Sequence, residues 1–175
     1  MTDLQPGDVF ATLNPRLVGR MIRAVTQWWS KDGQSEFGHA GIIVNANGTT
    51  IEALWHTQYN HLDKYIGKNI IIARPTHTLA GKEISPDMHE AALAQIVKDH
   101  LQQHYPWWRI PFHLIPPLAR LWASGNHLVC SELVAKYLCL IGARGNVYVG
   151  INPDDLADNW TYWRNFEVLY KGVWK

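Results

Sequence analysis

Two cysteines lie nine positions apart in the stretch HLVCSELVAKYLCL, residues 127–140, and their thiols are the most nucleophilic groups of this sequence. The spacing of the apolar residues predicts one helix that contains both. Each residue of an α-helix turns by about 100°, so nine steps place Cys130 and Cys139 about 180° apart. The two thiols therefore face different surroundings and cannot bond to each other within that helix.

Cys130 is the better candidate for chemistry. It falls on the predicted buried side of the helix, with Leu133, Val134, Tyr137, Leu138 and Ile141. It also lies in the first turn, where backbone N–H groups without a helical partner favour a thiolate. Cysteine is common in protein cores, however, and the helix alone equally allows a packing role. A nucleophilic thiol needs a base within hydrogen-bond reach and a third polar group that orients this base.

The stretch GHAGIIV supplies a candidate base. His39 opens a short apolar strand, in which a buried imidazole needs a hydrogen-bond partner. A structural histidine is the alternative interpretation. Gly38 and Gly41 lie beside it, and the absence of side chains there would let another backbone or a substrate come close.

The third residue depends on how two strands pair. The stretch NANG predicts a hairpin between the histidine strand and the next one. If Asn47 and Gly48 form a two-residue turn, His56 lies opposite His39, and Glu52 is too far along the strand to touch it. A longer loop or a bulge brings Glu52 opposite His39 instead. The sequence leaves both Glu52 and His56 as candidates.

The pattern of the whole chain predicts one α+β domain, residues 1–175, a length that can bury a substantial core. The expected strands are residues 4–13, 37–44, 49–56, 68–75 and 165–173, and the expected helices are residues 15–29, 85–105 and 127–145, with a helical turn at 152–158. Ser85 and Pro86 mark a helix start. The isoleucine run in the fourth strand indicates burial on both faces. We expect a mostly antiparallel sheet packed against the cysteine helix.

Several short motifs occur in an order that resembles a known family. They are GDV near the start, GHAGIIV followed by IEA, CSELV at a helix start, and NPDDLA shortly after. Together they resemble the circularly permuted branch of the NlpC-type papain-like cysteine hydrolases. This branch includes the YiiX-like proteins and is related to the lecithin:retinol acyltransferase-like enzymes. The resemblance spans nearly the whole chain, with the histidine strand before the cysteine helix, the reverse of papain.

This resemblance implies a permuted papain-like fold and a role for each candidate residue. It makes Cys130 the nucleophile, His39 the general base and Glu52 the residue that orients the base. Tyr105 stands where the branch often has a Tyr-Asp pair near the site, but here the next residue is Pro106.

The segment after Tyr105 is rich in proline and tryptophan and includes Trp107 and Trp108. By position it is a candidate lid or acyl-chain groove beside the thiol, and these two tryptophans are candidate substrate contacts. An irregular packed loop is an equally good interpretation, since four prolines prevent a regular helix there.

We therefore expect a cysteine hydrolase, or an acyltransferase, that acts on an amide or ester through a thioester. The substrates implied are cell-wall-type peptides or acyl groups on lipids, and no cofactor is needed. We expect no metal site, because His56, His61 and His77 lack the spacing of known metal ligands. The alternative is a non-catalytic module that binds a lipid or a protein on the same fold.

Composition limits the partners and the compartment. The chain has 16 Lys and Arg against 15 Asp and Glu, spread along its length, so nucleic acid is not an expected partner. The N-terminal residues do not form a signal peptide, and the apolar stretches are too short to cross a bilayer. We expect a cytoplasmic monomer with free thiols, unless another route exports it, and at most a peripheral contact with membranes.

Overall fold

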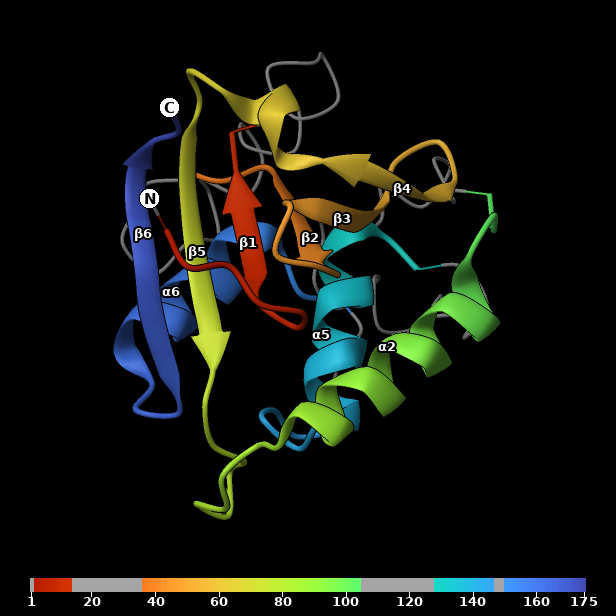
Figure 1. Ribbon diagram of the computed structural model, residues 1–175, viewed down its shortest axis with the longest axis vertical. Helices are drawn as coiled ribbons and strands as arrows, with labels where there is room; N and C mark the ends of the chain where they lie inside the picture. The colour runs from red at the N-terminus through yellow and green to blue at the C-terminus, as the bar shows by residue number, and fades with distance from the viewer. Residues whose placement is uncertain (1, 14–35, 105–127, 147–149) are drawn as a thin grey trace.

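The computed structural model describes residues 2–13, 36–104, 128–146 and 150–175. Within these residues six strands form one antiparallel sheet in the order β4-β3-β2-β1-β5-β6 (Figure 1). The strands are β1 (Val9–Thr12), β2 (His39–Ile43), β3 (Thr49–Ala53), β4 (Thr57–His61), β5 (Asn69–Pro75) and β6 (Phe166–Val173). The helices are α2 (Pro86–His100), α5 (Cys130–Leu140) and α6 (Pro153–Tyr162), with a short 3₁₀-helix η1 (Leu62–Tyr65). The predicted α+β class and mostly antiparallel sheet are confirmed.

Helices cover one face of the sheet. Helix α5 packs on β2, α6 packs on β1 and β6, and α2 packs on α5 (Figure 1). Alternate residues of a strand point to opposite faces, and β5 shows this clearly. Ile71 belongs to the core under the helices, whereas Ile70 and Ile72 belong to a second core on the other face, with Phe10 and Tyr65. The predicted burial of both faces of this strand is confirmed.

Helix α5 has the orientation that its sequence pattern predicts. Cys130 and the apolar residues that share its side of the helix are all buried. Cys139 is half-buried on the other side, and its thiol donates to the carbonyl of Gly145 at 2.8 Å. Burial raises the pKa of the Cys139 thiol. The two cysteines are free, and the differences in their surroundings follow from their positions on the helix.

The hairpin between β2 and β3 has the longer of the two loops considered for it. Val44 N–H donates to the Thr49 carbonyl at 2.8 Å, so the loop contains the four residues between them. The side chain of Asn45 accepts from the N–H groups of Asn47 and Thr49, which holds the loop in place. Gly48 has a φ of 84°, a conformation that favours glycine. A two-residue turn through Asn47 and Gly48 does not form.

The helix predicted over residues 127–145 ends at Leu140, and two further predicted elements end early because of one long-range contact. The strand predicted over residues 49–56 ends at Ala53, and after a bend the separate strand β4 begins at Thr57. The helix predicted to reach residue 105 ends at His100. Both changes have one cause: Thr57 exchanges backbone hydrogen bonds with Gln102 and Gln103, at 2.7 and 2.9 Å. This long-range pairing pulls the chain after α2 out of the helix.

Some predictions lie outside the described residues. They are the helix expected at residues 15–29, Tyr105, Trp107, Trp108 and the proline-rich segment that follows. In the part of the chain that the structure describes, no helix is both long enough and apolar enough to span a bilayer.

Candidate active site

His39 lies between a carboxylate and a thiol that are far from each other in the sequence. It is the first residue of β2 and is only 2% exposed. Its Nε2 atom is 2.7 Å from Oε2 of Glu52 on β3. The side chain of Cys130, at the start of α5, is close enough to the same imidazole to raise its pKa. The fold thus brings together Cys130, His39 and Glu52, the three residues that the sequence suggested as candidates.

Glu52 reaches His39 diagonally across the sheet, because Gly41 leaves room for it. The pairing of Ile42 with Ile51 continues in register to place Gly41 opposite Glu52. A Cβ atom on Gly41 would lie 2.9 Å from Cγ of Glu52 and 2.6 Å from a ring carbon of Phe10. The open space beside Gly41 is therefore filled by two side chains, not by another backbone or a substrate as we expected.

His56 is not part of this arrangement. It is exposed at the bend between β3 and β4, where it forms a β-bridge with His104, and the two ring centroids are 4.6 Å apart. The two-residue turn that would have brought His56 opposite His39 does not form. Of the two candidates for the third residue, only Glu52 contacts His39.

The Glu52 carboxylate is fully buried and fully hydrogen-bonded. Thr50 donates its hydroxyl to Oε1 at 2.5 Å, Tyr65 donates to Oε2 at 2.5 Å, and the ammonium of Lys64 lies 3.4 Å from Oε2. Burial alone raises the pKa of Glu52, but the hydrogen bond and charge of His39, helped by Lys64 and Thr50, lower it to about 2. Glu52 is therefore an anion at neutral pH.

The imidazole of His39 is held in its charged form by its two partners. Burial lowers the pKa of His39, whereas the hydrogen bonds and charges of Cys130 and Glu52 raise it, to a net value of about 9. Because Nε2 donates to Glu52, the nitrogen left for the Cys130 thiol is Nδ1. The ring is thus oriented from one side by a carboxylate and faces the sulfur with the other.

Cys130 lies where a helix begins. It is 4% exposed, and Val129, the N-cap residue, has no side chain that could accept a hydrogen bond from the first turn. The N–H groups of the first turn have no acceptor within their own helix. Positive partial charge from these groups is directed toward the sulfur and toward any oxygen bound beside it.

Three of the residues that hold Glu52 were missed in the sequence. Thr50 is two residues before Glu52, so the strand periodicity that puts both on one face of β3 could have identified it. Lys64 and Tyr65 come from η1, a short element without a distinctive sequence pattern. Only the folding of η1 over the second face of the sheet brings them to the carboxylate.

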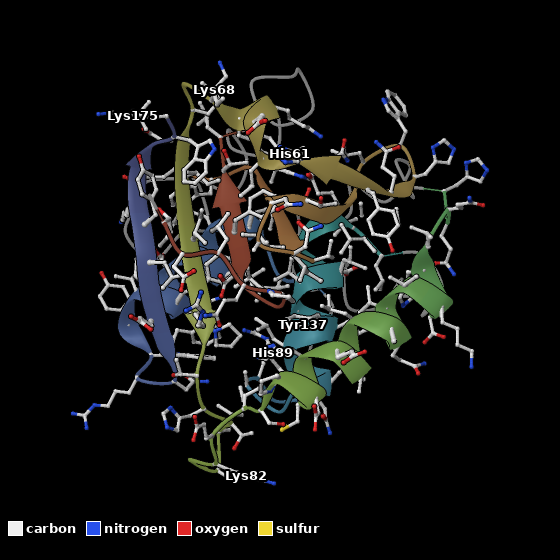
Figure 2. All side chains as sticks on the ribbon, viewed as in Figure 1. His61, Lys68, Lys82, His89, Tyr137 and Lys175 are labelled. Carbon is white, nitrogen blue, oxygen red and sulfur yellow. The ribbon has the colours of Figure 1, made fainter. Side chains whose placement is uncertain are left out.

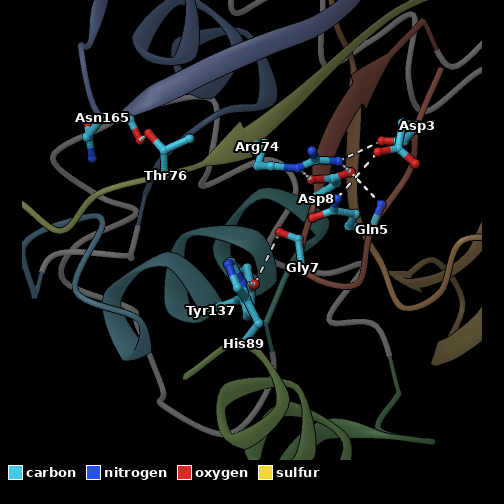
Figure 3. Close-up of polar contacts among 9 residues, drawn as sticks. All are labelled: Asp3, Gln5, Gly7, Asp8, Arg74, Thr76, His89, Tyr137 and Asn165. Carbon is cyan, nitrogen blue, oxygen red and sulfur yellow. Dashed lines mark hydrogen bonds and ion pairs between the residues drawn. The ribbon is translucent and has the colours of Figure 1, made fainter. Parts of the chain in front are cut away.

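The GDV motif anchors the cysteine helix farther along its length. Tyr137 of α5 donates its hydroxyl to the carbonyl of Gly7 at 3.1 Å, and Nδ1 of His89 on α2 lies 2.5 Å from the hydroxyl oxygen of Tyr137 (Figure 2). Asp8 accepts two hydrogen bonds from the guanidinium of Arg74, at 2.8 and 2.9 Å (Figure 3). These contacts lie about two helical turns from Cys130, so they belong to the framework and not to the reacting groups.

No group of three or more His, Cys, Asp or Glu side chains among the described residues is arranged to hold a metal ion. The candidate site contains one cysteine, one histidine and one glutamate: Cys130, His39 and Glu52. The imidazole and the carboxylate bond to each other.

Comparisons with known proteins identify a similar fold. No protein-family model matches the chain, and no curated protein sequence is significantly similar to it. Its structure is similar to the crystal structure of the metalloprotein YiiX from Escherichia coli O157:H7, with a TM-score of 0.61. The two share 17% sequence identity over 99% of each chain. The fold is therefore YiiX-like over the full length, while the relation to NlpC-type and permuted papain-like enzymes stays a prediction.

Proposed function

We propose that this protein is a cysteine hydrolase of a permuted papain-like type, which cleaves an amide or ester bond through a thioester intermediate. The observation that carries the proposal is the buried imidazole of His39, which is bonded to the Glu52 carboxylate and is close enough to the Cys130 side chain for that side chain to raise its pKa. This is the constellation of nucleophile, base and orienting group that activates a thiol. The raised pKa of His39 adds support, because it favours a positively charged imidazolium beside the sulfur of Cys130.

The proposed reaction has two halves. Before the substrate binds, the Cys130 proton passes to His39, which gives the charged imidazole. The thiolate sulfur then attacks the carbonyl carbon to form a tetrahedral intermediate. When this intermediate collapses, the bond to the amine or alcohol breaks, and His39 returns the proton to that leaving group. Water then loses a proton to His39 and attacks the thioester, which releases the acid and restores the thiol. Glu52 stays ionised and holds the imidazole in place.

The helix start supplies stabilisation for the negative oxygen. The backbone N–H of Cys130 lies in the first turn of α5, where it is not needed for a helical hydrogen bond. An oxyanion formed beside the sulfur would accept from this group and would gain from the helix dipole. An alcohol or amine in place of water in the second half would make the same site an acyltransferase.

The substrate proposed is a peptide amide of cell-wall type or an acyl group on a lipid. Both contain a carbonyl carbon that a thiol can attack, and both are substrates implied by the family that the sequence motifs resemble. The YiiX-like fold supports this proposal at the level of architecture. The site needs no cofactor for the steps above.

Selective alkylation tests the proposal. At neutral pH, iodoacetamide should modify Cys130 at least about tenfold faster than Cys139, because the thiolate is the reactive form. His39→Ala should remove most of this difference. His77→Ala is the matched control, since His77 is exposed and contacts Thr76, not the site. Mass spectrometry of the peptides that contain each cysteine measures both rates.

Equal rates at the two cysteines in the wild-type protein would exclude an activated thiol. The same fold would then be better interpreted as a module that binds a lipid or a protein without turnover. That alternative requires Cys130→Ala to keep full ligand affinity and biological effect.

A further inference from the structure

The segment that leads into β2 is held by a buried carboxylate of another element. Asp154, in the first turn of α6, is only 4% exposed. Its Oδ1 atom accepts from the N–H groups of Glu36 and Phe37, at 2.8 and 3.1 Å. Phe37 is two residues before His39, so this carboxylate fixes the backbone just before the proposed base.

The loop before α6 is held in turn by the first turn of α5. The hydroxyl of Ser131 donates to the carbonyl of Ile151 at 2.6 Å. The carboxylate of Glu132, which is fully buried, accepts from the N–H of Gly150 at 3.1 Å and from that of Val129 at 3.3 Å. The two residues that follow Cys130 are therefore bonded to the two residues that precede the N-cap of α6.

These contacts form one continuous path between the two reacting side chains. The path runs from Cys130 to its neighbour Ser131, whose hydroxyl bonds to Ile151. The chain then enters α6, where Asp154 bonds to the backbone of Phe37, two residues before His39. Asn152 stiffens the middle of the path, because its side chain caps α6 by accepting from the N–H of Asp155 at 2.7 Å. His39 and Cys130 lie on different elements, and this path sets their relative position without touching either side chain.

We propose that Asp154 is a positioning residue that keeps the imidazole of His39 within reach of the sulfur of Cys130. A buried oxygen that accepts from two N–H groups at once defines the position of that backbone more tightly than either bond alone. The carboxylate also lies at the positive end of α6, which stabilises its charge. This inference rests on the proposed function, since it assigns a residue to the thiol–imidazole pair of that site.

The test compares two adjacent acidic residues. Asp154→Ala removes the acceptor for Glu36 and Phe37, whereas Asp155→Ala removes a carboxylate from the same helical turn whose side chain accepts from Asn152 instead. The rate of alkylation of Cys130 by iodoacetamide is measured as a function of pH for both variants and the wild-type protein. Circular dichroism checks that each variant is folded.

We expect Asp154→Ala to slow the alkylation of Cys130 by about tenfold or more at neutral pH, because small displacements of reacting groups have large effects on rate. Asp155→Ala should keep the wild-type profile. Asp154→Asn retains one carbonyl oxygen in the same place and should restore most of the rate.

Two results overturn parts of this account, and they can be told apart. If Cys130 of the wild-type protein reacts no faster than Cys139, the proposed function itself fails. If the wild-type thiol is activated but Asp154→Ala has the profile of Asp155→Ala, only the positioning role fails. If Asp154→Ala does not fold, Ser131→Ala interrupts the path at its other end. A wild-type profile for Ser131→Ala then rejects the positioning role.

Discussion

Glu52 stays ionised although no water reaches it, and the reason lies in its hydrogen bonds. An unpaired carboxylate in such a place would be protonated, because burial strongly disfavours the charge. Here the two oxygens accept from Thr50, Tyr65 and His39, and Lys64 adds a positive charge nearby. The same anion then favours the charged form of His39. The two residues stabilise each other, so their protonation states change together.

The pair predicts a pH dependence of stability. The pKa of His39 is raised from 6.5 to about 9, so its contribution is complete below pH 6.5 and is lost as the pH rises through about 9. The pKa of Glu52 is lowered from 4.5 to about 2, so its contribution is complete above pH 4.5 and is lost as the pH falls toward 2. Both contributions are present between pH 4.5 and 6.5.

Glu52→Gln should weaken the dependence of stability on pH above pH 6.5. Without the anion the pKa of His39 falls, so the loss of stability between pH 6.5 and 9 should be smaller than in the wild-type protein. Urea denaturation over a series of pH values measures it. Glu167→Gln, at an exposed position of β6, serves as the control and should follow the wild-type curve. Identical pH dependence in Glu52→Gln and wild-type protein would contradict the coupling.

The β2–β3 hairpin decides which side chains meet. Its four-residue loop sets a register in which Gly41, not His39, lies opposite Glu52. The carboxylate then leans across the glycine to reach the imidazole. Compared with the two-residue turn, the four-residue loop shifts the pairing of β3 by two residues. This shift keeps each side chain on the same face, moves His56 away from His39 and brings Glu52 into diagonal contact with it.

Gly41→Ala tests this packing. The added methyl group would collide with Phe10 and Glu52, and overpacking of this kind costs about 1–3 kcal/mol of unfolding free energy. Displacement of Glu52 should also slow the alkylation of Cys130. Gly145→Ala is the matched control, since the nearest atom to its added Cβ is 4.0 Å away. A Gly41→Ala protein with wild-type stability and reactivity would show that the site tolerates a shifted carboxylate.

The elements themselves were predicted with uneven success, for reasons that can be named. Helix α5 and strand β5 were predicted well, because their burial follows from periodicity within one segment. The predicted ends of α2 and of the strand over residues 49–56 were wrong, and β4 was not predicted, because these features depend on hydrogen bonds between Thr57 and residues 102–103. A pattern along the chain contains no information about such a distant partner.

At the scale of the whole molecule, Tyr137 connects the helix layer to the sheet layer. This side chain connects helix α5 both to the Gly7 turn before β1 and to His89 on α2 (Figure 3). Its hydroxyl is buried, and the carbonyl of Gly7 would lose this donor if the hydroxyl were removed. The GDV motif is therefore explained by the attachment of the helix layer to the sheet, at a distance from the reacting groups.

Tyr137→Phe should lower the unfolding free energy of the protein without changing the reactivity of Cys130. A buried carbonyl left without its donor costs about 1–3 kcal/mol of unfolding free energy, measured by urea denaturation. The pH profile of Cys130 alkylation should stay as in the wild-type protein, because Tyr137 lies about two turns away along α5. Tyr170→Phe removes a hydroxyl that donates to Val173 in an exposed setting and should change stability little. A changed profile in Tyr137→Phe would extend the site toward the Gly7 turn.

The sequence by itself determined which groups could react and which faces are buried. The position of Cys130 in the first turn, the opposite placement of Cys139 and the apolar strand of His39 all follow from residue type and local periodicity. Only the tertiary structure decided that Glu52 and not His56 contacts His39, since this depends on loop length and on the empty space at Gly41. It also brought Asp154 to residues 36 and 37, more than a hundred positions earlier in the chain. Such pairings are decided by how the layers pack, because no local pattern records the distance between residues that only the fold brings together.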